Sequence, residues 1–402
     1  MDISIPSNIL ERILSINTIS ISPEYEKYLS YWPLFVMGLI VSFLLTPVIG
    51  LLAKKLGAIY IPGRGRNGKD FDNPEKAIHD TDTPAMGGLA ITIPILIAIP
   101  LLFRLDPTTI PILIALGILV VGSLLDDIFN LSSKIQLAYQ LLAASVIAVS
   151  IIDLANISFF SEDLLNLTAY TWSANILSLP LSFVFPGDLI LIAWLFLCIN
   201  SVKWVGGSPG LVESYSLTAF LLLFIVGVRT FSLFSSSISA LIAGSLVALL
   251  YFAYPTPKIM SGSSGKSLYG FLISVLALIS GMKFSSTIIL LAIPILDAIY
   301  VIIYRIVKYK PKNPIELMRI NDTSHLHHRL LKLELNSKQI LLIETSLSLV
   351  IGSLAILAAG ALRYFALIFS LAFVIAFIVF INYRANRKEE IKKASPESKY
   401  SY

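Results

Sequence analysis

Long apolar stretches separated by short polar segments run along the chain from residue 32 onward. A helix that spans a bilayer needs about 20 mainly apolar residues, with a range of about 17–25. Eleven stretches approach or reach this length: 32–53, 86–103, 107–125, 135–153, 186–202, 214–228, 232–253, 267–281, 284–305, 339–361 and 364–383. The pattern predicts an all-α polytopic integral membrane protein with about eleven (10–11) transmembrane helices.

The composition supports this class. The chain is 56% hydrophobic and 14% charged, whereas soluble domains carry about 25% charged residues. The one cysteine, Cys198, lies in an apolar stretch, which excludes a disulfide framework or a cysteine metal site. Residues 1–30 are mixed polar and apolar, resemble no cleavable signal peptide, and are a candidate for a short interfacial helix.

The basic residues predict the orientation. An odd number of spans puts the two ends of the chain on opposite sides of the membrane. With the N-terminus outside, 24 of the 30 Lys and Arg residues fall on the inner side, as the positive-inside rule requires. We therefore expect a transmembrane domain at 31–383 and a basic cytoplasmic tail at 384–402. The inner segments are then 54–85, 126–134, 203–213, 254–266 and 306–338, and they contain all four histidines.

Asp126 and Asp127 end an apolar stretch at its inner side. A charge at the bilayer centre costs roughly 2.5–3.5 kcal/mol, whereas carboxylates at the mouth of a helix avoid most of this cost and can meet a polar ligand. A solvated helix end explains such a pair equally well.

Three imidazoles and a guanidinium lie close together in His325, His327, His328 and Arg329. Arginine binds phosphate in a bidentate way, and histidine can donate to phosphate or move a proton near neutral pH. The cluster favours contact with a phosphate or nucleotide. A metal-binding tract and a solvated basic loop are the alternatives.

Three further segments bring small residues to inner helix ends. They are the stretches 79–90, 200–211 and 257–271. The third has Gly262 and Lys266 around a serine-rich turn, a plausible backbone nest for phosphate, and its spacing is not that of a Walker A loop. Tight interhelical turns are the alternative. Asp297 lies inside an apolar stretch, where a carboxylate is a functional candidate or the partner of a neighbouring helix.

Together these motifs resemble the polyprenyl-phosphate N-acetylhexosamine-1-phosphate transferases, a glycosyltransferase family 4-like superfamily. It includes undecaprenyl-phosphate N-acetylglucosamine-1-phosphate transferases and phospho-MurNAc-pentapeptide transferases. The resemblance covers roughly residues 50–335 and rests on Lys76 to His79 with Thr83 to Gly88, Asp126 to Ser132, Pro294 to Asp297, and His325 to Arg329.

The resemblance implies an enzyme and its site. A polyprenyl phosphate such as undecaprenyl phosphate attacks a UDP-N-acetylhexosamine such as UDP-GlcNAc, releases UMP and begins a cell-wall or other cell-envelope glycan. Asp126 and Asp127 would be the catalytic pair and, with Mg²⁺, the metal ligands. The substrate-binding residues would be His325, His327, His328, Arg329, His79, Lys76, Asn200, Lys203, Gly262 and Lys266. A multi-pass protein of the plasma membrane with a cytoplasmic site is expected, as a homodimer and without a nucleic-acid partner.

The chain departs from the family pattern at its metal site. Lys203 stands where the family has an asparagine, Ser263 where it has a metal-binding aspartate, and Gly206 and Pro209 where it has two further aspartates. We expect Lys203, with Lys266, to supply part of the positive charge of the metal. Two other readings stay open: a degenerate relative that binds lipid or nucleotide without turnover, and a transporter, against which the absence of inverted repeats weighs.

Overall fold

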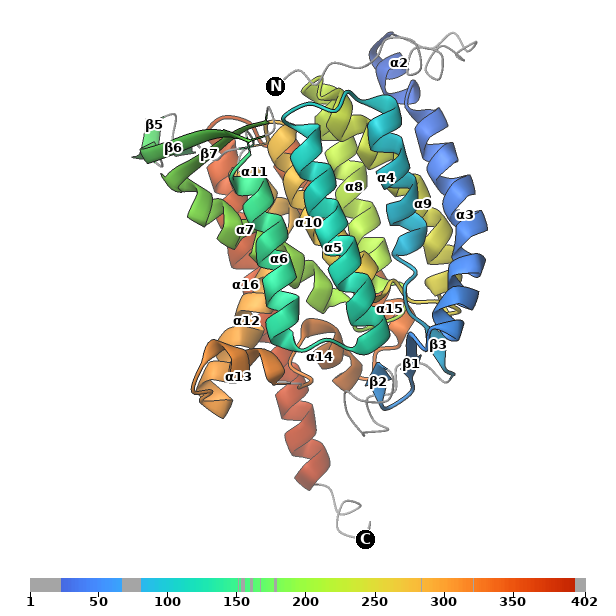
Figure 1. The fold of residues 1–402 in the computed structure, drawn as a ribbon. Coiled ribbons are helices and arrows are strands. Elements are labelled where there is room, and N and C mark those ends of the chain that lie inside the picture. The colour runs from blue at the N-terminus through green and yellow to red at the C-terminus, as the bar shows by residue number, and fades with distance from the viewer. Residues whose placement is uncertain are drawn as a thin grey trace.

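A computed structural model of the chain describes residues 23–66, 81–150, 152, 156–159, 162–166, 168–176, 179–282, 284–320 and 322–394. Its helices form one bundle with roughly parallel long axes (Figure 1). They are α2 (Pro23–Leu29), α3 (Trp32–Lys55), α4 (Leu89–Leu102), α5 (Thr109–Phe129), α6 (Ser133–Ala148), α7 (Gly187–Val205), α8 (Leu211–Arg229), α9 (Leu233–Ala253), α10 (Gly262–Ile279), α11 (Phe284–Leu290), α12 (Ala292–Tyr309), α13 (Pro314–Arg319), α14 (Leu326–Lys332), α15 (Ser337–Leu357) and α16 (Leu362–Ala394).

The predicted all-α polytopic class is confirmed. Within the described residues, eight helices are long and apolar enough to cross a membrane, and the pair α11–α12, bent by 78°, makes up to nine. Each of the eleven predicted stretches coincides with one helix or with this pair. Helices α4 and α6 have only 14 and 16 residues, which is short for a span. Eleven spans and the side of each terminus therefore stay predictions.

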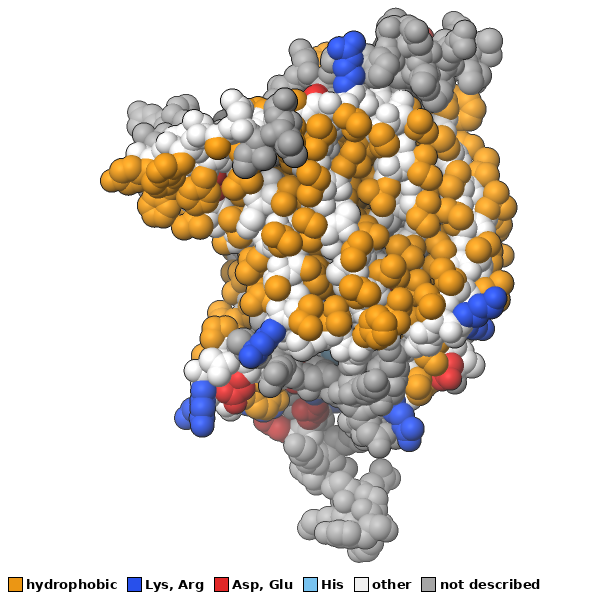
Figure 2. Space-filling view, in the orientation of Figure 1, with side chains coloured by type: hydrophobic (Ala, Val, Ile, Leu, Met, Phe, Trp, Pro, Cys, Tyr) orange, Lys and Arg blue, Asp and Glu red, His pale blue; other side chains and the backbone are white. Residues whose placement is uncertain are grey.

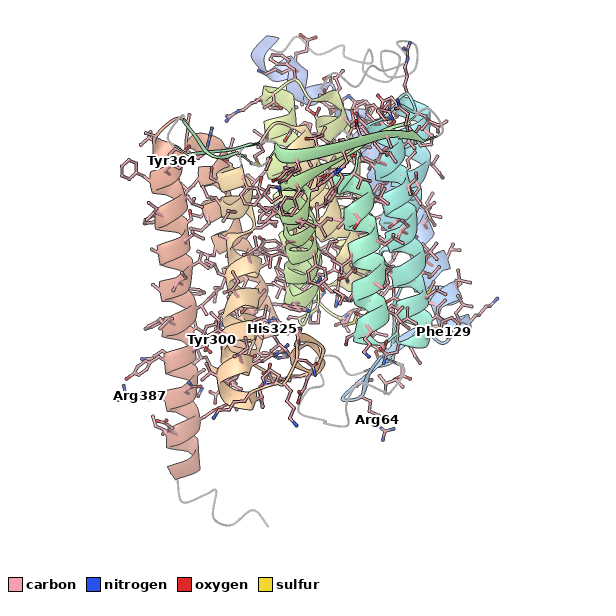
Figure 3. All side chains as sticks on the ribbon, turned by 60° about the vertical axis from the view of Figure 1, so that its left-hand side comes forward. Arg64, Phe129, Tyr300, His325, Tyr364 and Arg387 are labelled. Atoms are coloured by element: carbon pink, nitrogen blue, oxygen red, sulfur yellow. The ribbon has the colours of Figure 1, made fainter. Side chains whose placement is uncertain are left out.

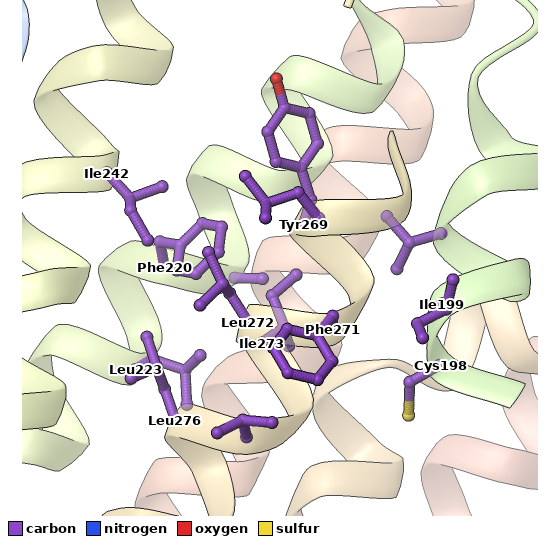
Figure 4. Close-up of a cluster of buried hydrophobic side chains, with 14 of the residues drawn as sticks. Cys198, Ile199, Phe220, Leu223, Ile242, Tyr269, Phe271, Leu272, Ile273 and Leu276 are labelled. Carbon is purple, nitrogen blue, oxygen red and sulfur yellow. The ribbon is translucent and has the colours of Figure 1, made fainter. Parts of the chain in front are cut away.

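Helix α10 lies at the centre of the bundle. Figure 4 shows Leu272 of α10 on the side of Phe220 of α8 and Ile242 of α9, and Phe271 on the side of Cys198 and Ile199 of α7. All of these side chains are buried, and α10 also packs against α5 and α7. A helix held on all sides in this way gives its first residues a fixed position at one end of the bundle.

Two antiparallel hairpins lie at the end of the bundle where α2 begins (Figure 1). They pair β4 (Asn156–Phe159) with β5 (Glu162–Asn166) and β6 (Thr168–Ile176) with β7 (Leu179–Pro186). The predicted helical stretches 135–153 and 186–202 left this segment as a connecting loop. Tyr170 and Trp172 of β6 stack on each other and are more than half exposed.

A small three-stranded sheet lies at the opposite end. Its order is β2 (Gly65–Arg66), β1 (Ile59–Ile61), β3 (Thr83–Pro84), with antiparallel pairs. Figure 2 shows hydrophobic side chains over the flank of the bundle, with most Lys and Arg side chains of this face near the sheet end. That arrangement is typical of a protein whose flank lies in lipid. Helix α16 runs on into the predicted tail as far as Ala394, and the rest of the tail and residues 1–22 lie outside the described residues.

Candidate functional site at one end of the bundle

Direct contacts join all five predicted inner segments. Met260 donates its N–H to Pro84 O at 2.8 Å, Asp127 accepts from Ser263, and Lys203 Nζ lies 3.9 Å from Asp126 Oδ2. The Gly206–Gly207 turn meets both Lys266 and His327. Figure 3 shows Phe129 and His325 at about the same height, near the end of the bundle opposite Tyr364. Segments far apart in the chain therefore form one polar layer.

Asp127 caps the start of α10. Its Oδ1 accepts the N–H of Ser263 at 2.6 Å, and its Oδ2 accepts the N–H of Ser264 at 3.0 Å. Gly262 has a φ of +68°, and a Cβ there would lie 2.5 Å from Asp127 Oδ2. Glycine thus permits both the left-handed turn and the close approach. A carboxylate at this position is favoured because the N-terminus of a helix carries a partial positive charge.

Asp126 belongs to a second network. Its Oδ1 accepts from Leu131 N at 3.0 Å and from Gln136 Nε2 at 2.9 Å, and its Oδ2 accepts from Ser263 Oγ at 2.5 Å. Lys203 Nζ lies 3.9 Å from the same Oδ2 and donates to Gln136 Oε1 at 2.6 Å. Asp126 and Asp127 are both 0% exposed. The alternative of a solvated helix end is therefore wrong.

Asp297 positions the histidine cluster. Its Oδ2 lies 2.8 Å from His325 Nδ1, and its Oδ1 accepts the N–H of Leu326 at 2.9 Å. The carboxylate therefore caps α14 and favours the His325 tautomer that carries a proton on Nδ1. Asp297 contacts the cluster and is buried behind it.

His327 lies against the turn that ends α7. A Cβ on Gly207 would come within 1.9 Å of His327 Nε2, so only glycine fits at this contact. The His327 ring stacks on His325 and touches His328, with centroid distances of 5.8 and 4.3 Å. Burial, together with the nearby His328, His325 and Lys266, lowers the pKa of His327 well below its usual 6.5.

Lys266 fixes the same turn from the other side. Its Nζ donates to Gly206 O at 2.7 Å and lies 5.8 Å from the centroid of the Tyr60 ring. An ammonium and an imidazole thus flank two successive glycines, where backbone can approach a ligand closely. This turn is the part of the site best suited to a phosphate.

Three other predicted residues have different surroundings. Arg329 donates to Asn386 Oδ1 of α16 at 3.0 Å and lies over the Tyr304 ring of α12, so it joins helices at the edge of the site. Asn200 donates to Gln140 Oε1 at 2.8 Å, between α6 and α7. His328 contacts the His327 ring.

Two predicted residues, Lys76 and His79, lie outside the described residues.

The sequence analysis missed two polar side chains. Gln136 bridges Asp126 and Lys203. Glu213, in the first turn of α8, is buried and accepts from Ser261 Oγ at 2.5 Å. A carboxylate beside the start of an apolar stretch was the available signal for Glu213. For Gln136 the signal was the family pattern itself, which has Lys or Gln four residues after the serine that stands at Ser132.

The donor set does not fit the Mg²⁺ that the family resemblance implies. Mg²⁺ demands octahedral oxygen coordination, usually with carboxylates. Every carboxylate oxygen of Asp126 and Asp127 already accepts a hydrogen bond, and the ammonium of Lys203 lies beside them. Within the part of the chain that the structure describes, no group of three or more His, Cys, Asp or Glu side chains could hold a metal ion.

Comparisons with known proteins agree with the motifs. The model of glycosyl transferase family 4 matches residues 109–281, which include the acid pair, the turn after α7 and the start of α10.

Three relatives cover most of the chain. A "Probable undecaprenyl-phosphate N-acetylglucosaminyl 1-phosphate transferase" of Bacillus subtilis is 25% identical over 86% of this chain and 87% of its own length. A decaprenyl-phosphate N-acetylglucosaminephosphotransferase of Mycobacterium leprae is 26% identical over 76% and 77%. A phospho-N-acetylmuramoyl-pentapeptide-transferase of Staphylococcus haemolyticus is 24% identical over 73% and 88%. The chain is thus a multi-pass membrane protein that matches glycosyl transferase family 4 over residues 109–281 and is similar to these three transferases over most of its length.

Proposed function

We propose that the protein transfers an N-acetylhexosamine 1-phosphate from a UDP-sugar to a polyprenyl phosphate and releases UMP. The observation that carries this proposal is the meeting of the Asp126–Asp127 pair, the Gly206–Gly207 turn and the His325–His328 cluster in one polar layer. That layer lies at the end of an apolar bundle, where a lipid phosphate and a water-soluble nucleotide can meet.

The reaction needs positioning and charge neutralisation more than covalent chemistry. An oxygen of the lipid phosphate forms a bond to the β-phosphorus of the UDP-sugar. The bond from that phosphorus to the bridging oxygen breaks, and the electron pair leaves with UMP. A phosphate monoester has a second pKa of about 6, so the attacking oxygen is already ionised near neutral pH and needs no strong base.

The described side chains suit these tasks. Lys266 and His327 flank the turn where the diphosphate would lie, and Lys203 adds a positive charge one helical turn earlier on α7. Asp126 and Asp127 hold Lys203 and the start of α10 in place. In this assignment the acid pair organises the cations that bind phosphate.

The lipid tail would lie on the flank of α12. The break before this helix bends the α11–α12 pair by 78°. Ile299, Ile303 and Val307 along α12 are 38%, 56% and 70% exposed. A prenyl chain could pack on this apolar face and enter sideways from the bilayer, with its phosphate near α14.

The relatives favour N-acetylglucosamine as the sugar, since two of the three are named for it. The distribution of Lys and Arg along the sequence favours the cytoplasmic face of the plasma membrane. From these two points we propose that the product begins a cell-envelope glycan on the inner leaflet. A homodimer remains an expectation from the family resemblance.

The test is incubation of the purified protein with polyprenyl phosphate and a panel of UDP-sugars, followed by UMP release and by label in organic-extractable lipid. We expect one UDP-N-acetylhexosamine to react. Lys266→Gln should abolish the reaction, and the matched change Lys308→Gln, on the exposed end of α12, should not.

One alternative is supported by the donor set. A relative that binds nucleotide and lipid without turnover would agree with the poor fit to Mg²⁺. Nucleotide binding without lipid labelling for any sugar would favour this alternative. Uptake of label into sealed vesicles, without any labelled lipid, would favour a transporter.

A further inference from the structure

We infer that Lys203 is a resident cation that takes the place of a divalent metal ion, so that this site binds a nucleoside diphosphate without Mg²⁺. The inference rests on the proposed function for the identity of the ligand. Its basis is the network that ties Lys203 to the acid pair.

The ammonium is held between two fixed acceptors. Lys203 Nζ donates to Gln136 Oε1 at 2.6 Å and lies 3.9 Å from Asp126 Oδ2. Gln136 in turn donates its amide nitrogen to Asp126 Oδ1 at 2.9 Å. The amide therefore has one consistent orientation, with its oxygen toward the ammonium and its nitrogen toward the carboxylate. Only 13% of the Lys203 side chain is exposed, so the cation is part of the wall of the site.

The rest of the charge of the acid pair is balanced by α10. The N-terminus of a helix carries about half a positive charge, and Asp127 accepts its N–H groups from Ser263 and Ser264. The Ser263 hydroxyl donates to Asp126 Oδ2. A carboxylate at residue 263 would instead face two others and would need a metal ion between them. Lys203 and Ser263 are thus consistent with each other as parts of a metal-free site.

A metal ion would also be repelled. Two unit positive charges about 4 Å apart interact unfavourably by an amount that corresponds to roughly a 10³-fold loss of affinity at an effective dielectric of 20. The double charge of Mg²⁺ makes this a lower bound. The ammonium offers what the metal would have offered, because it is a compact point charge that suits phosphate oxygens.

A second cation is in place beside the first. Lys266 donates to the carbonyl oxygen of Gly206, and Gly206 lies three residues after Lys203 in the chain. His327 contacts the next residue, Gly207. His327 Nε2 is buried and has no hydrogen-bond partner within the described part of the chain. The turn therefore has an ammonium on one side and an imidazole nitrogen without a partner on the other. In the tautomer with its proton on Nε2, both groups can donate to the oxygens of a diphosphate.

The experiment measures metal and nucleotide binding separately. Mn²⁺ binding is followed by electron paramagnetic resonance on the full chain in lipid nanodiscs, and UDP binding by calorimetry with Mg²⁺ and with EDTA. We expect no stoichiometric Mn²⁺ site in the parent protein. We expect UDP to bind equally well in both buffers and at least tenfold more weakly in Lys203→Gln. The double variant Lys203→Asn/Ser263→Asp should gain one Mn²⁺ site at least 10²-fold tighter than any in the parent.

The matched control is Lys308→Gln, which removes an exposed ammonium elsewhere and should leave both measurements unchanged. If the double variant does not fold, the parent and Lys203→Gln measurements decide the question. One Mn²⁺ per parent chain, lost in Asp126→Asn, would overturn the inference, as would UDP binding that requires Mg²⁺.

The proposed function can fail independently of this inference. Metal-independent UDP binding without transfer to any lipid would support the inference and refute the transferase. Transfer that needs Mg²⁺, with a Mn²⁺ site in the parent, would support the transferase and refute the inference.

Discussion

Replacement of Asp127 by asparagine should destabilise the protein even though it preserves the shape of the side chain. Each carboxylate oxygen of Asp127 accepts a different backbone N–H, one from Ser263 and one from Ser264. An amide has only one oxygen, so its NH₂ group must face the other N–H at 2.6–3.0 Å. The site is fully buried, and water is not at hand to accept the orphaned donor.

The magnitude follows from three losses. A hydrogen bond to a charged group contributes about 1.5–3 kcal/mol, and a buried unsatisfied donor costs roughly 1–3 kcal/mol. Removal of a negative charge from a helix N-terminus costs about 0.3–1 kcal/mol at exposed sites and more when buried. These effects overlap, so we expect Asp127→Asn to lower the free energy of unfolding by roughly 3 kcal/mol. Because α10 then shifts, turnover should also fall by about 10²-fold.

Asp106 provides a matched control. Its Oδ1 alone accepts the N–H groups of Thr108 and Thr109 near the start of α5, so asparagine can make both bonds with its single oxygen. Asp106→Asn should cost less than about 1 kcal/mol. Equilibrium unfolding in mixed micelles would compare the two variants with the parent. Equal stability of Asp127→Asn and Asp106→Asn would refute the reasoning.

Three further predictions follow from the site and the charge pattern. The pKa of His327 is lowered in the folded protein, so as the pH falls below 6.5 the imidazole of the unfolded chain takes up a proton before that of the folded chain. The free energy of unfolding should therefore fall by up to about 1.4 kcal/mol per pH unit below pH 6.5 and stay level above it. A His327→Asn variant whose stability has the same pH slope as the parent would contradict this prediction. Gly207→Ala drives a Cβ against His327 and should weaken UDP binding at least tenfold in calorimetry, whereas Gly117→Ala, which meets nothing within 4 Å, should not. A cysteine at Ser398 should resist a membrane-impermeant thiol reagent in intact cells, and rapid labelling would reverse the predicted orientation.

The positions of the helices could be predicted because apolar length is a local property of the sequence. Every predicted stretch from 32–53 to 364–383 coincides with a helix or with the bent pair. The prediction was weaker at 156–186, where the chain forms β-hairpins. Apolar and polar residues alternate from Tyr170 to Ile176, which is the period of a strand. The signal for β6 was therefore present in the sequence, and the expectation of a loop overlooked it.

The members of the site could be predicted in part. Motif residues such as Asp126 and His327 were found because several polar residues interrupt an apolar pattern together. Arg329 directly follows His328 in the sequence, yet successive residues of a helix point about 100° apart, and the side chain of Arg329 meets α16. The contact between Gln136 and Lys203 spans 67 residues, and only the packing of α6 against α7 makes it evident.

The aromatic hairpin β6–β7 has a consequence for the depth of the site. Tyr170 and Trp172 are exposed at the end of the bundle opposite the site, and such side chains prefer the boundary between headgroups and acyl chains. Helix α9, with 21 residues, is about 32 Å long, close to the hydrocarbon thickness of a bilayer, about 30 Å. With the hairpin resting at one boundary, the thickness of the bilayer determines how far Lys266 and His327 lie from the phosphates of the other leaflet. The match between the length of the bundle and the thickness of the bilayer therefore affects how easily the substrates reach the site. In a thicker bilayer the phosphate-binding turn would lie deeper than the headgroup layer, and in a thinner bilayer it would lie outside that layer.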